Sequence, residues 1–300
     1  MAPITPLERY KDLAKAIGAS DVYLKREDLH PYGSHKGRSI PVMIDAKAST
    51  GDRRFVISSS GNAALAAALY AKDWNAASRK KEIGASPLDL TIYIGTHADP
   101  AKATKIKALE DGKNVRVLVK ERPLQAVTAA VKEGATSLRQ SNDDTALLGY
   151  QSLVEELAAQ HNKIGAVFIG TSSGTTAQAL AQGFLDKEMG AQVHIVQTSS
   201  CHPMSAAFEP YDGPHERSVA GAIVDTVALR KPVLVPLVEK TGGRGWTATN
   251  DEILAAQDMV REHAGLEISV NSALSIAGLI QATEIGWEYD GAAICMICGD

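Results

Sequence analysis

Residues 54–72 read RFVISSSGNAALAAALYAK. The run Arg54–Ile57 predicts a short buried strand, because it is apolar after its first residue and ends at turn-forming residues. Ser58–Asn62 predicts a turn, and the alanine-rich stretch Ala63–Lys72 predicts a helix. A strand followed directly by a helix indicates a parallel α/β domain, because parallel neighbours need a crossover connection.

The same alternation continues along the chain. Two more predicted strands, Thr91–Gly95 and Val115–Val119, each precede a helix that opens at a proline, Pro100 or Pro123. From about Ala146 the pattern restarts, with helices predicted at 147–160, 176–189, 251–263 and 272–283 and strands at 166–170, 193–197 and 292–297. We interpret 74–87 as a polar insertion and assign 203–245 to no element. The sequence thus predicts two α/β domains.

Composition excludes several classes of protein. The 300 residues suggest roughly two domains. A net charge of −4 and only 5% aromatic residues argue against a nucleic-acid partner. The longest apolar run, Ala63–Ala71, is shorter than the ~20 residues of a membrane span, so no membrane partner is expected. Three cysteines form no disulfide framework, and the start Met1–Pro6 resembles no secretory signal, so a cytoplasmic protein is expected.

Lys36 is the first candidate for chemistry. It follows a Pro31–Gly33 turn within Gly33-Ser34-His35-Lys36-Gly37-Arg38. A neutral lysine amine can form a Schiff base with an aldehyde cofactor. The alternative is an ordinary solvated lysine at the start of a helix.

Two turns at strand ends are candidates for binding anions, because ligands of open α/β sheets bind at the carboxyl ends of strands. Ser58–Asn62 exposes backbone N–H groups at a helix start, although Ser and Asn also serve there as simple caps. Gly170–Thr176 lacks both the G-x-G-x-x-G and the G-x-x-x-x-G-K-[ST] patterns, so it predicts neither a dinucleotide nor a nucleoside triphosphate site. Its hydroxyls and amides still suit one phosphate.

In this order and spacing, these segments resemble the fold type II family of pyridoxal-phosphate (PLP) enzymes, the tryptophan synthase β-like superfamily. The resemblance runs from Thr5 to the last predicted strand. It implies two open, twisted parallel-sheet domains with helices on both faces. It also implies PLP as cofactor, a large PLP-binding domain at 1–40 and 140–300, and a small domain at 41–139 that closes over the substrate.

The resemblance assigns roles to residues. Lys36 of the S-x-K-x-R motif, formed with Ser34 and Arg38, would be the catalytic lysine that bonds PLP. Asn62 would lie beside the phenolic oxygen of PLP, and Cys298 would face its pyridine nitrogen. The phosphate would be bound by Gly170, Thr171, Ser172, Ser173, Gly174 and Thr175. The substrate carboxylate would be bound by Ser58, Ser59, Ser60, Gly61 and Asn62, with Gln151 as a further substrate contact.

Different segments resemble enzymes of the family that catalyse different reactions. Lys25–Leu29, Ser60–Ala64 and Gly174–Thr176 are most similar to threonine synthases, which convert O-phosphohomoserine to threonine and phosphate. The acidic stretch Ser141–Thr145, with Arg139 as its only nearby cation in sequence, and Gly149–Ser152 resemble serine/threonine dehydratases instead. Cysteine synthase and a PLP-binding protein without turnover remain alternatives. We therefore expect a PLP-dependent carbon–oxygen lyase acting on a small amino acid.

Three further expectations concern partners and metals. Relatives usually form homodimers, so a homodimer is expected. The pair Cys295 and Cys298 forms a C-x-x-C, which we interpret as neither a zinc nor a redox site, because no second pair exists and their odd spacing on a strand points them to opposite faces. No metal is expected.

Overall fold

The computed structural model describes residues 3–299. The chain divides into two compact units. Unit 1 comprises Met1–His30 and Tyr150–Asp300, and unit 2 comprises Pro31–Gly149. Unit 2 begins ten residues before the expected 41 and ends ten residues after the expected 139, so it includes Lys36, whereas Cys298 lies in unit 1.

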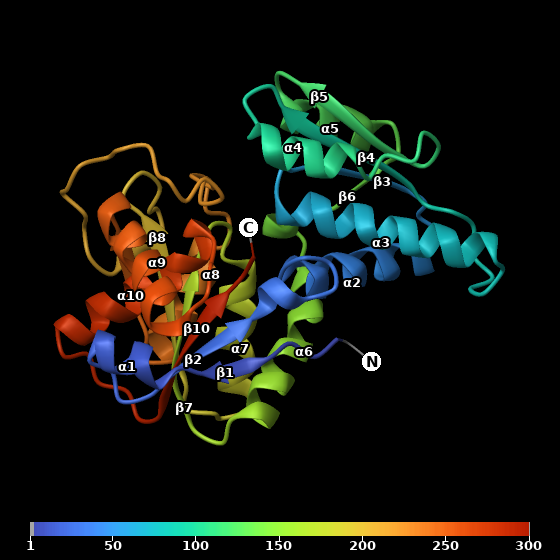
Figure 1. The fold of residues 1–300 in the computed structure, drawn as a ribbon. Helices are drawn as coiled ribbons and strands as arrows, with labels where there is room; N and C mark the ends of the chain where they lie inside the picture. Colours follow the sequence, from blue (N-terminus) through green and yellow to red (C-terminus); the bar gives the residue numbers. More distant parts are fainter. Residues whose placement is uncertain (1–2, 300) are drawn as a thin grey trace. The chain divides into compact units, whose positions relative to one another are not determined.

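Unit 1 is built on a six-stranded sheet in the order β1-β2-β10-β7-β8-β9 (Figure 1). Only β1 runs antiparallel to its neighbour, β2; the other pairs are parallel. Every residue of β10 is buried, as expected for a central strand covered on both faces. The strands are β1 (Leu7–Arg9), β2 (Val22–Arg26), β7 (Ile164–Gly170), β8 (Gln192–Thr198), β9 (Gly245–Ala248) and β10 (Ala292–Ile297).

Helices cover both faces of this sheet (Figure 1). On one face, α1 (Lys11–Ile17), α9 (Asn250–Ala264) and α10 (Val270–Glu284) form an apolar core with alternate strand residues such as Ala166 and Phe168. On the other face, α7 (Thr175–Asp186) and α8 (Lys231–Lys240) pack on each other and on β8. Helix α6 (Thr145–Gln160) contains the boundary between the two units.

Unit 2 has a four-stranded, fully parallel sheet in the order β5-β4-β3-β6. Phe55 and Ile57 of β3 pack in the cluster that includes α2 and α3, whereas Val56 packs against Val127 of α5. Alternate residues therefore serve cores on both faces. The strands are β3 (Arg54–Ser58), β4 (Asp89–Gly95), β5 (Val115–Lys120) and β6 (Thr136–Ser137); the helices are α2 (Lys36–Ser49), α3 (Asn62–Arg79), α4 (Pro100–Lys107) and α5 (Pro123–Lys132).

Two segments differ from the sequence-based assignment. Helix α3 continues to Arg79, so the first part of the supposed polar insertion is helical. Asn75 explains this: it is fully buried, its amide donates to the Leu88 carbonyl (2.9 Å), and its Oδ1 accepts from the Leu88 N–H (2.6 Å). The unassigned stretch contains α8, β9 and a short 3-10 turn, η3 (Ser205–Ala207).

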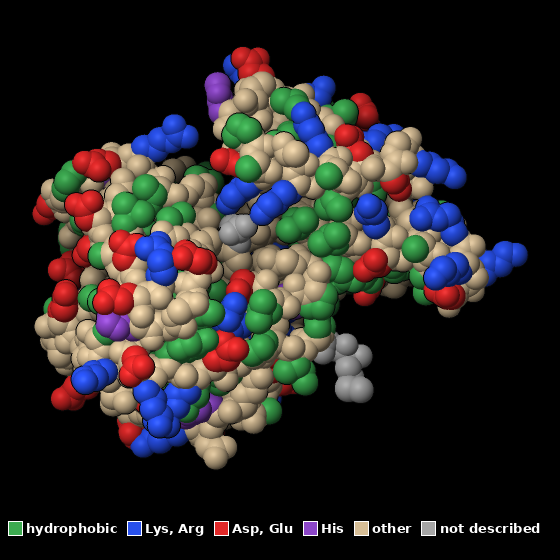
Figure 2. All heavy atoms as spheres, in the orientation of Figure 1, with side chains coloured by type: hydrophobic (Ala, Val, Ile, Leu, Met, Phe, Trp, Pro, Cys, Tyr) green, Lys and Arg blue, Asp and Glu red, His purple; other side chains and the backbone are tan. Residues whose placement is uncertain are grey.

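The surface carries both charge signs. Figure 2 shows basic and acidic side chains interspersed over the face drawn, in agreement with 31 basic and 35 acidic residues in the sequence. Within residues 3–299, no helix combines the length and the apolar character that crossing a membrane requires.

Candidate active site

The glycine and hydroxyl loop 170–175 joins β7 to α7 in unit 1. Its two glycines are required sterically. A Cβ on Gly170 would lie 2.8 Å from the Asn271 carbonyl oxygen, and Gly174 has a φ of +82°, with Leu234 only 2.7 Å from an added Cβ. Gly174 is also the N-cap of α7, whose first N–H groups have no acceptor within the helix. The loop therefore has the backbone N–H groups and hydroxyls with which the predicted phosphate could hydrogen-bond.

Hydrogen bonds hold this loop to neighbouring strands. The Thr171 N–H donates to the Val196 carbonyl of β8 (2.8 Å), and the Gln197 side-chain amide donates to the Thr171 carbonyl (3.1 Å). Thr171 and Thr175 are buried, while Ser172 and Ser173 are half-buried. The backbone of the loop is therefore fixed, and its two serines are the more accessible hydroxyls.

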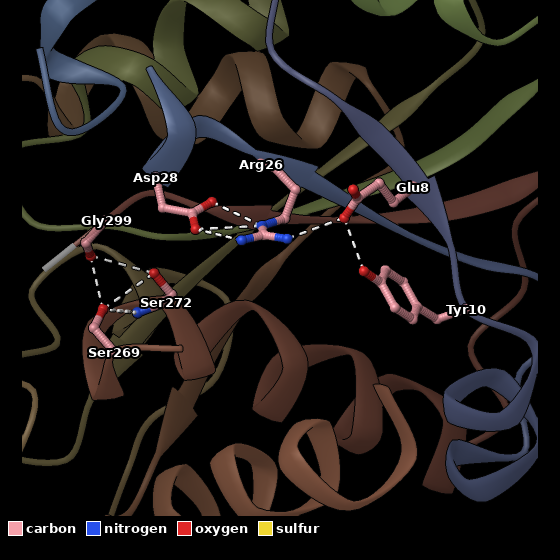
Figure 3. Close-up of polar contacts among 7 residues, drawn as sticks. All are labelled: Glu8, Tyr10, Arg26, Asp28, Ser269, Ser272 and Gly299. Atoms are coloured by element: carbon pink, nitrogen blue, oxygen red, sulfur yellow. Dashed lines mark hydrogen bonds and ion pairs between the residues drawn. The ribbon is translucent and has the colours of Figure 1, made fainter. Parts of the chain in front are cut away.

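The end of β10 is anchored to the first turn of α10 (Figure 3). Cys298 is 8% exposed directly after this strand. The next carbonyl, that of Gly299, accepts hydrogen bonds from the Ser269 hydroxyl (2.7 Å) and the Ser272 hydroxyl (3.3 Å). Because Asn271 of the same turn contacts Gly170, one helix start supports both candidate segments of unit 1.

The charged motif Lys25–Leu29 serves the structure of unit 1. Arg26 forms a two-point ion pair with Asp28 (2.9 and 2.8 Å) and a third contact with Glu8 (3.0 Å), which links β2 to β1 (Figure 3). Lys25 is fully buried, and its ammonium group donates to the Thr5 carbonyl (2.8 Å) and pairs with Glu156 of α6. This motif therefore positions the N-terminal segment rather than a ligand.

Lys36 is the first residue of α2 in unit 2. Its backbone N–H donates to the Ser34 hydroxyl (3.3 Å), and Ser34 is fully buried. The preceding Gly33 has a φ of +77°, and a Cβ there would come 2.9 Å from Leu65 of α3. Within residues 3–299, the half-buried Lys36 side chain forms no ion pair. The Gly33 turn that precedes Lys36 thus lies against α3.

The Ser58–Asn62 turn lies at the end of β3, the second candidate segment of unit 2. All five of its residues are half-buried. Gly61 is the N-cap of α3, and its N–H donates to the Ser59 hydroxyl (3.2 Å). The Asn62 side-chain amide makes no hydrogen bond in the part of the chain that the structure describes. The structure thus brings this turn and the Lys36 segment together through the contact of Gly33 with α3.

Gln151 lies apart from that turn. It is an exposed residue of α6 in unit 1, whereas Ser58–Asn62 belong to unit 2. Because the two segments belong to different units, a joint role for these residues stays a prediction.

In the acidic stretch before α6, Asp143 is paired with a cation from another segment. The Asp143 carboxylate accepts the Thr145 N–H (3.0 Å) and pairs with the Lys47 ammonium (3.4 Å). Burial alone would raise the pKa of Asp143, but the hydrogen bonds of Thr145 and the charge of Lys47 together lower it below its usual value. Lys47 is a cation that the sequence analysis did not connect to this stretch, because it is distant along the chain.

The two cysteines of the C-x-x-C motif differ in environment. Cys295 lies fully buried in β10, its thiol donates to the Ser275 carbonyl (3.5 Å), and burial raises its pKa. Cys298 lies just beyond the strand. Among residues 3–299, no group of three or more His, Cys, Asp or Glu side chains is arranged to hold a metal ion.

The motif of the 170–175 loop does not reveal the residues that contact it from elsewhere in the chain. Asn271 and Arg230 contact it from segments far along the chain. Ser269, the N-cap of α10, could have been suspected from the preference of Ser for caps. Nothing in the local sequence marks Arg230, which lies in the stretch left without an assignment.

The structure is an α/β protein with two open sheets, and the candidate turns lie where parallel strands end, which is where ligands of such sheets bind. Comparison with known proteins gives the family. The family described as "Pyridoxal-phosphate dependent enzyme" matches residues 3–299, so the chain belongs to it. The cofactor of the family is PLP, and the loop 170–175 has the donors and the glycines that its phosphate requires.

Individual relatives agree on the family. A threonine synthase of Methanocaldococcus jannaschii is 26% identical over 315 residues, covering 98% of this chain and 74% of that protein. An L-serine dehydratase/L-threonine deaminase of Mus musculus is 30% identical over 213 residues, covering 68% of this chain and 60% of that protein. Among solved structures, a PLP-dependent aspartate racemase aligns with a TM-score of 0.80 at 18% identity, covering 98% of this chain and 89% of that one. The last likeness shows the fold alone: fold type II.

Proposed function

We propose that this chain is a PLP-dependent carbon–oxygen lyase that acts on the side chain of a small L-amino acid, most like a threonine synthase. That reaction takes O-phosphohomoserine and water to threonine and phosphate. The observation that carries the proposal is the extent of similarity: threonine synthase aligns over 98% of the chain, against 68% for the dehydratase.

In this proposal, Lys36 is the catalytic residue. Its amine would hold the cofactor through the aldehyde carbon, and the same Nζ would remove the α-proton of the amino-acid substrate. When bound, PLP supplies the electron sink for that deprotonation. Within residues 3–299 no carboxylate pairs with the Lys36 amine, which supports its role in bonding a ligand.

The other candidate residues would bind and orient the cofactor and the substrate. Ser58, Ser59, Ser60 and Gly61 would hold the substrate carboxylate with the N–H groups at the start of α3. Asn62 would donate to the phenolic oxygen of the cofactor, and its amide is available for this. Cys298 would face the pyridine nitrogen, and the 170–175 loop would bind the phosphate. Gln151 would be a further substrate contact.

The geometry before α6 supports a phosphorylated substrate. Two aspartates in that stretch would repel a second phosphate if both carried a bare charge. The Lys47 ammonium pairs with the Asp143 carboxylate and so compensates one of these two negative charges. The stretch is therefore less negative toward a second phosphate than its sequence alone indicates.

A dehydratase is the second candidate. It would convert L-threonine or L-serine to a 2-oxo acid and ammonia, and the 30% identity to the mouse L-serine dehydratase/L-threonine deaminase favours it. Cysteine synthase and a PLP-binding protein without turnover are further alternatives. A homodimer, a cytoplasmic location and closure of the small domain over the substrate remain proposals that follow from the relatives.

The test is a product assay by proton and phosphorus NMR on PLP-loaded protein. O-Phosphohomoserine, L-threonine and L-serine are supplied separately, with the Lys36→Ala variant as the blank. Threonine with equimolar phosphate supports the synthase. Formation of a 2-oxo acid from threonine or serine, with O-phosphohomoserine unchanged, would reject the synthase and support the dehydratase. No product in any tube would leave the non-catalytic alternative.

A further inference from the structure

We propose that Gly149 is a positioning residue that fixes the start of α2, and with it Lys36, by letting α6 pack backbone to backbone against the first turn of α2. This inference rests on the proposed role of Lys36. It concerns unit 2 alone, because Gly149, Lys36 and the residues that join them all lie within 31–149.

The contact of Gly149 with α2 excludes any side chain at this position. Gly149 is a buried residue near the start of α6. A Cβ here would lie 2.3 Å from the Arg38 carbonyl oxygen, 2.8 Å from the Arg38 carbonyl carbon and 2.6 Å from the Ser39 Cα. These are backbone atoms, which cannot turn aside as the end of a side chain can. Any residue other than glycine must therefore push α2 and α6 apart.

Helix propensity does not explain a glycine at this position. Inside a helix, glycine is less favourable than alanine. The φ of Gly149 is not positive, so its backbone conformation does not require glycine either. The close approach of the α2 backbone is therefore the physical reason for it. The atoms approached belong to the turn Lys36–Ser39, which is the first turn of α2.

Hydrogen bonds hold the same turn of α2 to the segment around Gly149. The Ser39 hydroxyl, which is fully buried, donates to the Ala146 carbonyl of α6 (2.9 Å). The Ser39 oxygen accepts from the side-chain amide of Gln140 (2.7 Å), in the 3-10 turn η2 (Gln140–Asn142). The first turn of α2 is thus attached to this segment by polar contacts as well as by packing.

Lys36 is part of the turn that these contacts hold. The Ser34 hydroxyl accepts the Lys36 N–H (3.3 Å), and the Ser34 carbonyl accepts the Gly37 N–H (2.9 Å). In bonding the cofactor, the Lys36 Nζ replaces the aldehyde oxygen, which leaves as water. A displacement of about 1 Å by a distant substitution can slow such a step by about 10²-fold. Gly149 therefore controls how fast Lys36 bonds the aldehyde, and not how tightly the rest of the cofactor binds.

The experiment compares two ligands of the apo form of the full chain. PLP can bond to Lys36, whereas pyridoxine phosphate has an alcohol in place of the aldehyde and cannot. The rate of bonding at saturating PLP is measured by borohydride trapping at timed intervals, with the adduct at Lys36 quantified by mass spectrometry. The dissociation constant of pyridoxine phosphate is measured by equilibrium dialysis. We expect Gly149→Ala to slow the bonding by about 10–100-fold and to keep that dissociation constant within about twofold of wild type.

Ile44→Val is the matched control. Ile44 lies about two turns beyond Lys36 on the same helix and is buried in the core of unit 2. Loss of its methyl group destabilises that core without touching the contact of Gly149. This variant should bond PLP as fast as wild type does. Ser39→Ala, which removes the hydroxyl bonded to Ala146, should slow the bonding in the same direction as Gly149→Ala.

Several results would overturn the inference. If Gly149→Ala weakened pyridoxine phosphate binding as much as it slowed the bonding, Gly149 would have a general structural role. An unchanged rate in this variant, or equal slowing in Ile44→Val, would give it no role in positioning. If Gly149→Ala does not fold, Ser39→Ala decides, and bonding at the wild-type rate there would reject the inference.

Wild type separates this inference from the proposed function. If wild type forms no adduct at Lys36, the assigned role of Lys36 fails together with the inference. If wild type forms the adduct and Gly149→Ala forms it as fast, only the inference fails, and the proposed reaction stands.

Discussion

The Ser269 hydroxyl donates a 2.7 Å hydrogen bond to the Gly299 carbonyl oxygen, which ties the first turn of α10 to the segment that carries Cys298. Ser269 also caps α10, since its Oγ accepts the Ser272 N–H (3.2 Å). The same helix turn touches Gly170 through the Asn271 carbonyl. One short segment of unit 1 therefore fixes the ends of two adjacent parallel strands.

Ser269→Ala should destabilise unit 1 and loosen cofactor binding. The variant loses a helix cap and the bond to Gly299, and loss of an N-cap alone costs about 0.5–2 kcal/mol. We expect a fall of about 1–2 kcal/mol in the free energy of unfolding, measured by urea denaturation. Ser49→Ala, which removes an exposed hydroxyl bonded to the Ala46 carbonyl at the end of α2, is the matched control. If both variants lost the same free energy of unfolding, the stabilising role of the Ser269 hydroxyl would be contradicted.

Gly170→Ala should impair PLP binding as well as stability. The added methyl group would lie 2.8 Å from the Asn271 carbonyl oxygen and 3.2 Å from the Leu274 Cβ, so the loop or α10 must move. Such overpacking costs about 1–3 kcal/mol. The PLP dissociation constant should therefore rise by about tenfold or more. Gly221→Ala, where an added Cβ meets nothing within 4 Å, should bind PLP as wild type does; comparable weakening there would refute the steric argument.

Acid should destabilise the protein through His194. Its ring stacks on Phe168 (4.4 Å between centroids), and its Nδ1 accepts from the Trp246 indole (3.1 Å). Nε2 therefore carries the proton and donates to Gln192 Oε1 (3.0 Å). Burial, and next the charge of Arg244, lower the pKa of His194 from 6.5 to about 3. The folded protein thus holds this ring neutral at a pH where the unfolded chain protonates it.

The difference in the pKa of His194 between the folded and unfolded states determines how stability changes with pH. Between pH 6.5 and about 3, the unfolded chain binds one more proton at His194 than the folded protein does, so stability falls as the pH falls. The slope from this group is at most about 1.4 kcal/mol per pH unit. Urea unfolding from pH about 7 down to about 5, above most carboxylate titrations, should show the slope in wild type and reduce it in His194→Gln. His97→Gln, at an exposed histidine, should retain it; identical slopes in all three would exclude His194 as the cause.

Lys36→Ala should abolish covalent capture of the cofactor. Borohydride reduction of PLP-loaded wild type should leave PLP attached to the peptide that contains Lys36, as detected by mass spectrometry. The variant should show no such adduct and should lose at least about 10³-fold in turnover, because it lacks the proposed base as well. Lys132→Ala, at an exposed lysine of α5, should keep both properties. An adduct on another lysine in wild type would move the catalytic assignment.

The sequence predicted the sheets well where strands are buried on both faces. β10 was predicted at its observed bounds, and β3 and β7 were predicted within two residues. Short, continuous apolar runs bounded by turn-forming residues are typical of buried strands. The order of the strand-end turns was likewise enough for the family. Roles assigned to Lys36, Asn62 and the 170–175 loop remain predictions that the experiments above address.

What the sequence did not predict depends on contacts between distant segments. Helix α8 contains Pro236, which reads locally as a helix breaker, yet burial of Leu234, Leu237 and Val238 stabilises it. Arg230 begins this helix, so its approach to Thr175 was hidden together with it. Asn75 similarly extends α3 only because Leu88 returns to meet its amide.

Cys298→Asp should change the fate of the substrate rather than its binding. Under the proposed assignment, a carboxylate facing the pyridine nitrogen would keep that nitrogen protonated, whereas the neutral thiol does not. A protonated nitrogen stabilises negative charge on the cofactor ring and favours transamination over loss of the side-chain group. We expect the variant to release more pyridoxamine phosphate per elimination product, measured by chromatography after a fixed number of turnovers. Cys298→Ser, which stays neutral, should partition as wild type does. An unchanged ratio in Cys298→Asp, with normal PLP content, would remove Cys298 from control of the reaction.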